Sequence, residues 1–233
     1  MKKALLCLVL LMATCLSTKA QYQKGDLFLY PRIGFALANV SQQELYYTIG
    51  NGSQKSKMKH GLAAGIEAEA FVSNTFSISA GLFYTNQGFR FPDWAEEDKT
   101  ERTFSHFDDI HTTMQYVSLP VLLNAYLADG IAVKAGVQLG YLVKASDKYD
   151  ETWGNIEEGN AHIDMGSSSV NEDMTANFNR LDFSIPVGIS YEYSNIVIDL
   201  RYNIGLTKVF KNIPTENGRN QVLMVTLGYQ LEL

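Results

Sequence analysis

Residues Leu181–Leu206 have the sequence LDFSIPVGISYEYSNIVIDLRYNIGL, in which apolar and polar side chains alternate in two consecutive segments. Every odd position up to Tyr193 is apolar or aromatic, and from Ile196 onward the even positions carry that face. Successive side chains of a strand point to opposite sides of a sheet, so a period of two indicates β-structure. We therefore predict two strands joined by the turn Ser194-Asn195.

Six further segments show the same pattern. They are Ile131–Val143 and Leu223–Leu231, where the alternation is strict, and Leu27–Ala38, Leu62–Val72, Thr75–Gln87 and Met114–Leu127, where it is weaker. The expected strands are about 12 to 14 residues long, more than the roughly 5 to 6 typical of globular proteins and enough to cross a bilayer at a tilt. The pattern predicts eight membrane-spanning strands.

The two faces of these strands differ in charge. The apolar faces carry no charged side chain, so we expect them to contact lipid. The opposite faces carry charges that would be costly in an oily core but can pair inside a polar lumen. We predict a structural network of luminal charges formed by Arg32, Glu67, Glu69, Lys134, Asp182, Glu192, Asp199 and Arg201.

Within that network, Arg201 is expected to hold two carboxylates through its five donors. Its nearest partners should come from the two adjacent strands, and the candidates there are Asp182, Glu192, Gln230 and Glu232. Loss of Arg201 is expected to leave these acids unpaired.

The lengths of the connections support a barrel. Short turns at Ser73-Asn74, Ala128-Asp129-Gly130 and Ser194-Asn195 alternate with long polar segments at Asn39–His60, Gly88–Thr113, Ala145–Asn179 and Lys208–Arg219. Short periplasmic turns and long external loops are typical of outer-membrane barrels, and closure removes sheet edges from the hydrocarbon. We therefore expect an all-β, eight-stranded antiparallel up-and-down transmembrane β-barrel with short periplasmic turns and long extracellular loops.

Two prolines interrupt the predicted strands. Pro120 and Pro186 lie in the similar contexts SLPV and SIPV, where each lacks the N–H that a ladder would use. We expect a bulge or a kink at both positions.

The first twenty residues have the layout of a secretory signal. Two lysines precede an apolar run, and Ala20 offers a small residue for cleavage, so we expect residues 1–20 to be removed and 21–233 to form the barrel domain in the outer membrane. Lipidation at Cys15 is the alternative. Both cysteines, Cys7 and Cys15, lie in this segment, which would leave the mature chain without a thiol. Losing three lysines makes the net charge more negative than −6, which disfavours nucleic acid as a partner.

Several of these strands resemble a known family. The segments YVSLPVLLNAYL (116–127), IAVKAGVQLGYLV (131–143), LDFSIPVGISYEY (181–193), IVIDLRYNIGLTKV (196–209) and NQVLMVTLGYQLEL (220–233) are similar to PorT-like, porin-family outer-membrane β-barrels of Bacteroidota. The resemblance covers nearly all of the predicted mature chain, and its most specific pieces are DLRYNIGLT and the strands that contain LP or IP. It implies an eight-stranded outer-membrane barrel, and the namesake of the family is linked to protein secretion and gliding. The final residue, Leu233, departs from the aromatic residue that often ends such barrels.

Two groups of side chains could form a chemical site. His106, Asp108, Asp109 and His111 carry metal-binding atoms, as do Glu151, Glu157, Glu158 and Asp164. Both groups lie in predicted loops with no regular structure to hold the ligand spacing, so we favour solvated loops and expect no metal site and no cofactor. Ser118 and His111 are not placed as a nucleophile and base, so we expect no enzyme activity.

The interior of an eight-stranded barrel is just wide enough to be filled by side chains. We therefore expect a structural or surface-binding barrel that acts through its extracellular loops. A component of an outer-membrane transport or secretion apparatus is the alternative, and a lipid-modifying enzyme is a second. The expected partners are outer-membrane lipid and lipopolysaccharide, the barrel assembly machinery, and a protein or other surface ligand at the loops.

Overall fold

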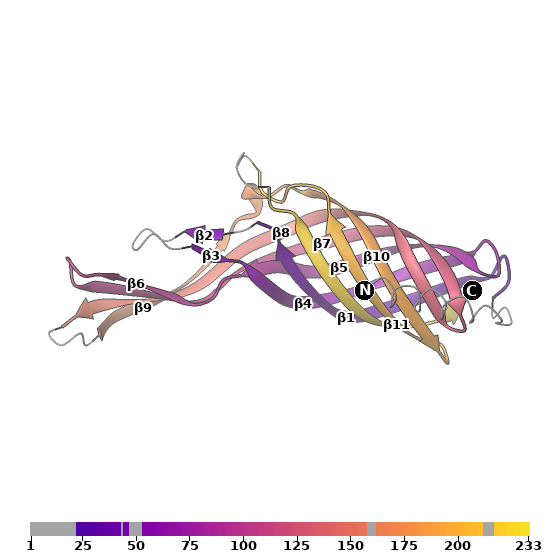
Figure 1. The fold of residues 1–233 in the computed structure, drawn as a ribbon, viewed down its shortest axis with the longest axis horizontal. Helices are drawn as coiled ribbons and strands as arrows, with labels where there is room; N and C mark the ends of the chain where they lie inside the picture. The colour runs from indigo at the N-terminus through magenta and orange to yellow at the C-terminus, as the bar shows by residue number, and fades with distance from the viewer. Residues whose placement is uncertain (1–21, 43, 47–52, 158–161, 212–216) are drawn as a thin grey trace, which may run out of the picture.

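The computed structural model describes residues 22–42, 44–46, 53–157, 162–211 and 217–233 (Figure 1). Residues 1–20, the predicted signal, lie outside this range. Eight strands form a closed ring: β1 (Leu27–Val40), β4 (Lys57–Phe71), β5 (Phe76–Arg90), β7 (Thr103–Ala128), β8 (Ile131–Ile156), β10 (Leu181–Tyr193), β11 (Ile196–Gly205) and β12 (Asn220–Tyr229). All neighbours are antiparallel and follow the order of the chain, and β12 pairs with β1 to close the ring. The predicted eight-stranded up-and-down barrel is confirmed.

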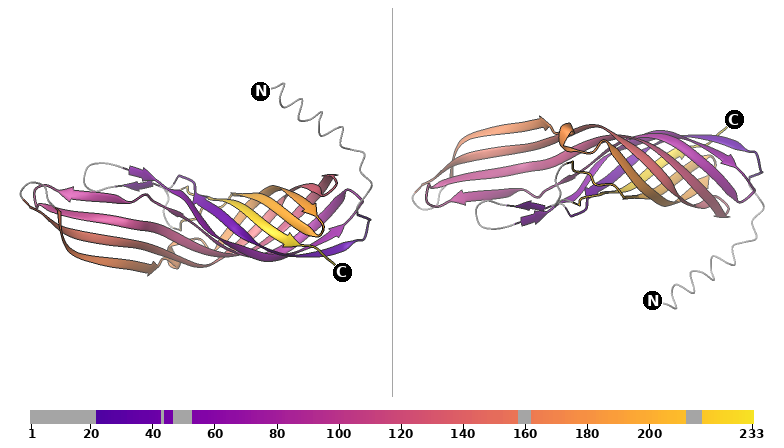
Figure 2. Two further views of the ribbon diagram at one scale, coloured as in Figure 1. Left: turned by 90° about the horizontal axis from the view of Figure 1, so that it is seen from below. Right: turned by 90° about the horizontal axis from the view of Figure 1, so that it is seen from above.

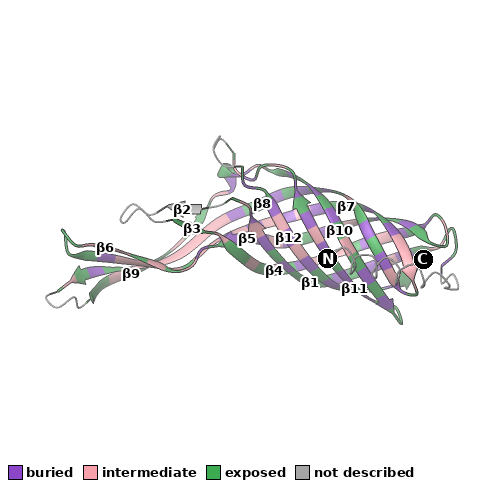
Figure 3. Ribbon diagram, in the orientation of Figure 1, coloured by how far each residue is buried: buried purple, intermediate pink, exposed green. Residues whose placement is uncertain are grey.

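The alternation of side chains divides the wall into two faces (Figure 3). Outward-facing apolar residues are well exposed, with Phe35 at 69% and Val137 at 64%. Inward-facing residues are buried, and these include all eight charged residues of the predicted network. Among the described residues, no helix is long and apolar enough to span a membrane.

The connections at one end of the barrel are tight turns, as predicted. Ser194 and Asn195 both adopt positive φ, the conformation of the two-residue turn that matches the twist of a hairpin. Gly130, in the turn between β7 and β8, also has a positive φ. A short strand after β12, β13 (Leu231–Glu232), pairs with β1 at this end.

At the other end, two of the predicted loops are wrong. Most of 88–113 and 145–179 is strand: β7 and β8 are each 26 residues long and continue past the ring. β6 (Trp94–Asp98) pairs with β7, and β9 (His162–Asp173) pairs with β8. These extensions mix polar and aromatic side chains on both faces, and bulges at Asp108–His111 and Trp153–Gly154 break their period, so alternation could not reveal them.

We call the four-stranded part beyond the ring the projecting sheet. It consists of β6, β9, residues Thr103–Ile110 of β7 and Ser146–Ile156 of β8, in the order β6-β7-β8-β9. Figure 2 shows that this elongated sheet extends from one end of the barrel. The strands continue for roughly ten residues, about 34 Å. Two smaller elements lie in the other connections at this end: a hairpin of β2 (Glu44–Tyr46) and β3 (Ser53–Lys55), and a 3₁₀ turn η1 (Thr175–Asn177).

The prolines do not cause bulges. On β7, the pairs Ala80–Val121 and Phe83–Ser118 have the same register on both sides of Pro120. On β10, register is likewise unchanged across Pro186. These registers place Gly81 and Gly136 opposite the two prolines, so a residue without a side chain faces each ring. The predicted bulges are therefore wrong, because the ladder omits only the pairs that would need the missing N–H.

The lumen is filled in layers. At the tight-turn end, Tyr22, Phe28, Tyr30, Phe71 and Val197 form an apolar cluster. The charged residues follow, and beyond them lies a cluster of Ala36, Ala38, Ala63, Phe83, Val222 and Met224. The end nearest the projecting sheet is covered by Val40, Phe89, Phe91, Met114, Tyr116, Leu142, Ala145, Phe178 and Val209. The interior is thus polar only in part, whereas the sequence predicts a polar lumen.

Closure between β1 and β12 should depend on Gly34. A Cβ at this position would collide with the backbone carbonyl of Val225 on β12. We expect Gly34→Val to destabilise the barrel by about 1–3 kcal/mol. Unboiled wild-type protein should migrate anomalously on a denaturing gel, and Gly34→Val should reduce that fraction at a fixed urea concentration. The neighbouring lipid-facing variant Ile33→Val is the control, and equal behaviour of the two variants would contradict the prediction.

Candidate functional site

Five of the charged luminal residues meet at the centre of the barrel, and we call them the central ion cluster: Arg32 on β1, Glu67 on β4, Lys134 on β8, and Asp199 and Arg201 on β11. Each carboxylate contacts all three cations. Glu67 lies 3.0 Å from Arg32, 3.8 Å from Lys134 and 2.9 Å from Arg201. Asp199 lies 3.6 Å from Arg32, 3.2 Å from Lys134 and 3.3 Å from Arg201. All five side chains are almost completely buried.

The predicted partners of Arg201 are wrong. Its guanidinium contacts Asp199 on its own strand and Glu67 on β4, which is separated from β11 in the ring by β1 and β12. The adjacent-strand rule fails here because the barrel is narrow enough for long side chains to meet across its axis. Loss of Arg201 would also not leave Glu67 and Asp199 unpaired. Arg32 and Lys134 contact both carboxylates.

The remaining three acids of the predicted network are held separately by neutral donors. Glu69 accepts hydrogen bonds from Tyr126 (2.8 Å), Asn124 (3.1 Å) and Ser77. Asp182 accepts from Thr207 at 3.1 Å and from Asn220 at 3.2 Å. Glu192 accepts from Gln230 at 3.3 Å. The structure therefore divides the eight residues into one ion cluster and three hydrogen-bonded carboxyl groups.

Aromatic residues complete the lining of the lumen, and the sequence analysis did not single them out. Tyr22 stacks on Phe71 with ring centroids 4.2 Å apart, and Gln230 donates to the hydroxyl group of Tyr30 at 3.0 Å. Phe28 and Tyr30 have the same parity as Arg32 on β1, which was the signal that could have placed them inside.

The four residues His106, Asp108, Asp109 and His111 form separate pairs. His106 contacts Asp108 at 2.8 Å, whereas His111 contacts the backbone carbonyl of Asp109 at 2.7 Å. Lys148 donates to Asp109 at 3.0 Å, and this hydrogen bond holds the pKa of Asp109 below its usual value. These contacts order the β7 bulge, where Asp109 has a positive φ.

The described residues include no group of three His, Cys, Asp or Glu side chains that could hold a metal ion. In the second predicted group, Glu151 and Asp164 lie on different strands and pair with Ser168 and Gly154. Glu158 lies outside the described residues. Ser118 and His111 are also apart: both are on β7, seven residues or about 23 Å from each other.

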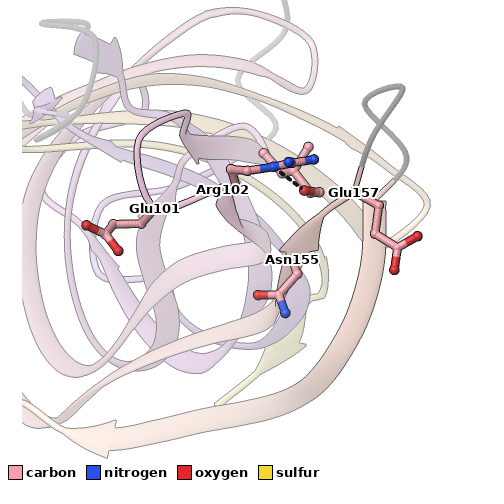
Figure 4. Close-up of a pocket in the computed structure, with 5 residues that line it drawn as sticks. Glu101, Arg102, Asn155 and Glu157 are labelled. Atoms are coloured by element: carbon pink, nitrogen blue, oxygen red, sulfur yellow. Dashed lines mark hydrogen bonds between the residues drawn. The ribbon is translucent and has the colours of Figure 1, made fainter.

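The tip of the projecting sheet contains a shallow groove (Figure 4). It is lined by Glu101, Arg102, Asn155, Ile156 and Glu157 and has a volume of about 530 Å³. Arg102 has a positive φ and donates from Nε to the carbonyl of Ile156 at 2.9 Å. This contact ties the β6–β7 turn to the end of β8.

Side-chain contacts across several strands hold the projecting sheet together. On one face, His162 of β9 stacks on Phe104 of β7 at 4.5 Å and lies 3.2 Å from Glu97 of β6. It passes over Gly154 of β8, where a Cβ would collide with Phe104. On the other face, Trp94 stacks on Phe107 at 4.5 Å. The sheet is thus a preformed surface rather than a set of loops.

Comparison with known families identifies the fold at the level of sequence. The family described as "Outer membrane protein beta-barrel domain" matches residues 20–211 of this chain. The chain belongs to this family. Membership places this barrel in the outer membrane, in agreement with its exposed apolar wall.

The chain is also similar to the solved structures of three other proteins. Ail, the attachment invasion locus protein of Yersinia pestis, is 15% identical, with 90% of this chain and 100% of that chain covered and a TM-score of 0.42. Neisserial surface protein A is 12% identical over 88% of this chain and 97% of that chain, with a TM-score of 0.45. OprG from Pseudomonas aeruginosa is 8% identical over 93% and 100%, with a TM-score of 0.41. Comparison with curated protein sequences finds no match.

The charge balance of the central ion cluster should determine which substitutions destabilise the barrel. Glu67→Gln would leave three buried cations with one carboxylate, so we expect a loss of about 3–5 kcal/mol in the free energy of unfolding. Arg201→Met keeps much of the volume and leaves two cations with two carboxylates, so we expect a smaller loss. Urea unfolding in liposomes measures both, with lipid-facing Ile198→Ala as the control expected to cost least. A larger loss for Arg201→Met than for Glu67→Gln would contradict the prediction.

Proposed function

We propose that this protein is a closed, non-conducting outer-membrane barrel that acts at the cell surface through its projecting sheet. The observation that carries the proposal is the length of β7 and β8, which continue past the ring and form a four-stranded sheet with β6 and β9. A preformed, solvent-exposed sheet offers a larger recognition surface than the tight turns at the opposite end. We propose that the tight turns face the periplasm and the projecting sheet faces outward.

The closed lumen supports this proposal over a porin-like role. Aromatic and aliphatic side chains cover both ends of the barrel, and paired charges fill a layer between these ends. The carboxylates are held by cations or by hydrogen-bond donors, so they do not line an aqueous channel. An interior of this size is expected to be structural. We likewise propose that the protein has no enzymatic activity and needs no cofactor.

The projecting sheet has an unusual charge that favours a binding role. The two chain segments that form this sheet and its connections, residues 91–113 and 145–173, contain 15 of the 25 acidic residues of the chain but only three of its 19 basic residues. Such a concentration of one sign steers oppositely charged partners toward a surface. We propose that the ligand of the sheet is cationic.

A role in protein secretion is the second candidate. It rests on the similarity of the β7, β8, β10, β11 and β12 sequences to PorT-like barrels, and in this role the projecting sheet would dock onto another envelope component. The two candidates differ in the phenotype of a deletion strain. Loss of proteins from the culture medium would favour the secretion role, whereas loss of one surface interaction would favour the first.

The filled lumen predicts a negative result in planar bilayers. Purified wild-type protein should give little or no stable conductance, because both ends of the lumen are covered by buried side chains. The double variant Phe89→Ala/Tyr116→Ala, which removes two of the covering rings, is the comparison and should raise the frequency of brief openings. Large, persistent steps from the wild-type protein would contradict a closed barrel.

Site-specific cross-linking in whole cells tests the surface role. A photo-reactive residue at Ser169 on β9 should capture a partner, because this strand is at the open side of the projecting sheet. Matched probes at Val137, on the lipid-facing wall, and at Asp129, in a tight turn, should not capture the same species. The proposal fails if Ser169 captures nothing while Asp129 captures a soluble partner, since the tight-turn end would then be the binding end.

A further inference from the structure

The outer edge of β9 is an unpaired sheet edge. In the described part of the chain, β9 pairs only with β8, and ten of its twelve residues are exposed. A free edge presents backbone N–H and C=O groups that another extended chain can use. Proteins often protect such edges with proline or lysine, but β9, with the sequence HIDMGSSSVNED, has neither.

The negative charge of β9 disfavours pairing of this edge with β9 of a second copy of the chain. Its charged residues are Asp164, Glu172 and Asp173, with no lysine or arginine. Antiparallel pairing of two β9 edges about Ser168 would place Asp164 opposite Glu172, and like charges in opposed positions are destabilising. A strand that carries positive charge would instead be attracted.

Trp153 adds a binding feature at this edge. This residue lies on β8 opposite Gly166 of β9, and its side chain is 40% exposed. A Cβ at Gly166 would lie 2.8 Å from the indole, so the ring covers the backbone of β9 where a side chain would otherwise be. The indole therefore reaches over the edge strand and is within range of a side chain on the next strand position. An indole face binds lysine and arginine better than other aromatic rings do.

We propose that the edge of β9 binds an extended cationic polypeptide segment as a fifth strand of the projecting sheet. This inference rests on the proposed surface role and specifies its ligand. Gly166, Ser168, Val170 and Glu172 share one face of β9. A basic residue opposite Gly166 contacts the indole of Trp153, and a second basic residue opposite Glu172 pairs with its carboxylate. The ligand therefore carries two basic residues six positions apart, with uncharged residues between them.

Synthetic peptides test this spacing on the full-length protein in lipid nanodiscs. The probe is a ten-residue peptide of threonine and valine with two arginines six positions apart, and the control has the same composition with the arginines five apart, on opposite faces of a strand. We expect the first peptide to bind about tenfold more tightly than the second, because only the first reaches both contacts. Equal affinities would overturn the proposal in favour of unspecific attraction between opposite charges.

N-methylation of the peptide tests strand addition directly. Methyl groups on alternate backbone nitrogens block one edge of the peptide at a time. Two complementary methylated peptides should differ, with one binding and the other not. Binding of both would show that no backbone ladder forms and would overturn the proposal.

Variants of the protein locate the site. Trp153→Ala and Glu172→Lys should each weaken the peptide with arginines six apart, whereas Glu101→Lys, with the same charge change at the tip, should not. Gel mobility of unboiled protein confirms that each variant is folded. An equal effect of Glu101→Lys and Glu172→Lys would overturn the placement at β9. If Ser169 cross-links a partner in cells but the peptides do not bind, the surface role stands and the cationic strand is wrong.

Discussion

The constraint on which this structure depends is that backbone N–H and C=O groups must find partners inside the protein wherever the chain crosses hydrocarbon. The pairing of β12 with β1 meets this constraint, because it is the contact that turns a sheet into a ring. The other features of the barrel follow from closure. Each strand must have one face toward lipid and one toward the lumen, and a ring of eight strands leaves an interior that side chains fill.

The narrow interior explains the arrangement of the buried charges. Long side chains from β1, β4, β8 and β11 meet near the axis, so that two carboxylates share three cations. Two of the cations also lie over aromatic rings: Arg32 is 5.1 Å from the ring centre of Tyr30, and Arg201 is 5.6 Å from that of Phe83. Desolvated guanidinium groups are thus compensated by several contacts each, and breaking a single contact leaves others in place.

The sequence predicts the features that follow from the local alternation of side chains. It does not predict contacts between residues that are far apart in the chain. The eight strands, the tight turns and the inward position of the eight charges follow from a period of two and a count of connections. The partner of Arg201 does not, because Glu67 is 134 residues away and not on an adjacent strand. The lengths of β7 and β8 are also not predicted, since strands that mix polar and aromatic side chains on both faces have no continuous apolar face to detect. Pro120 and Pro186 suggest bulges, but the strand register is the same on both sides of each proline.

The same backbone constraint separates the two parts of the molecule. Within the ring every strand has two neighbours, whereas β6 and β9 each have one in the described chain. Free edges are excluded from hydrocarbon but are tolerated in water, which satisfies the open groups. The projecting sheet is therefore the part of the wall where strands can remain unpaired. The chain segments that contain it, residues 91–113 and 145–173, also hold most of the acidic residues. Open backbone groups and a high negative charge thus occur together at this end, whereas the charges of the lumen are already paired. This distribution supports the proposed recognition role of the projecting sheet, with the barrel as its membrane support.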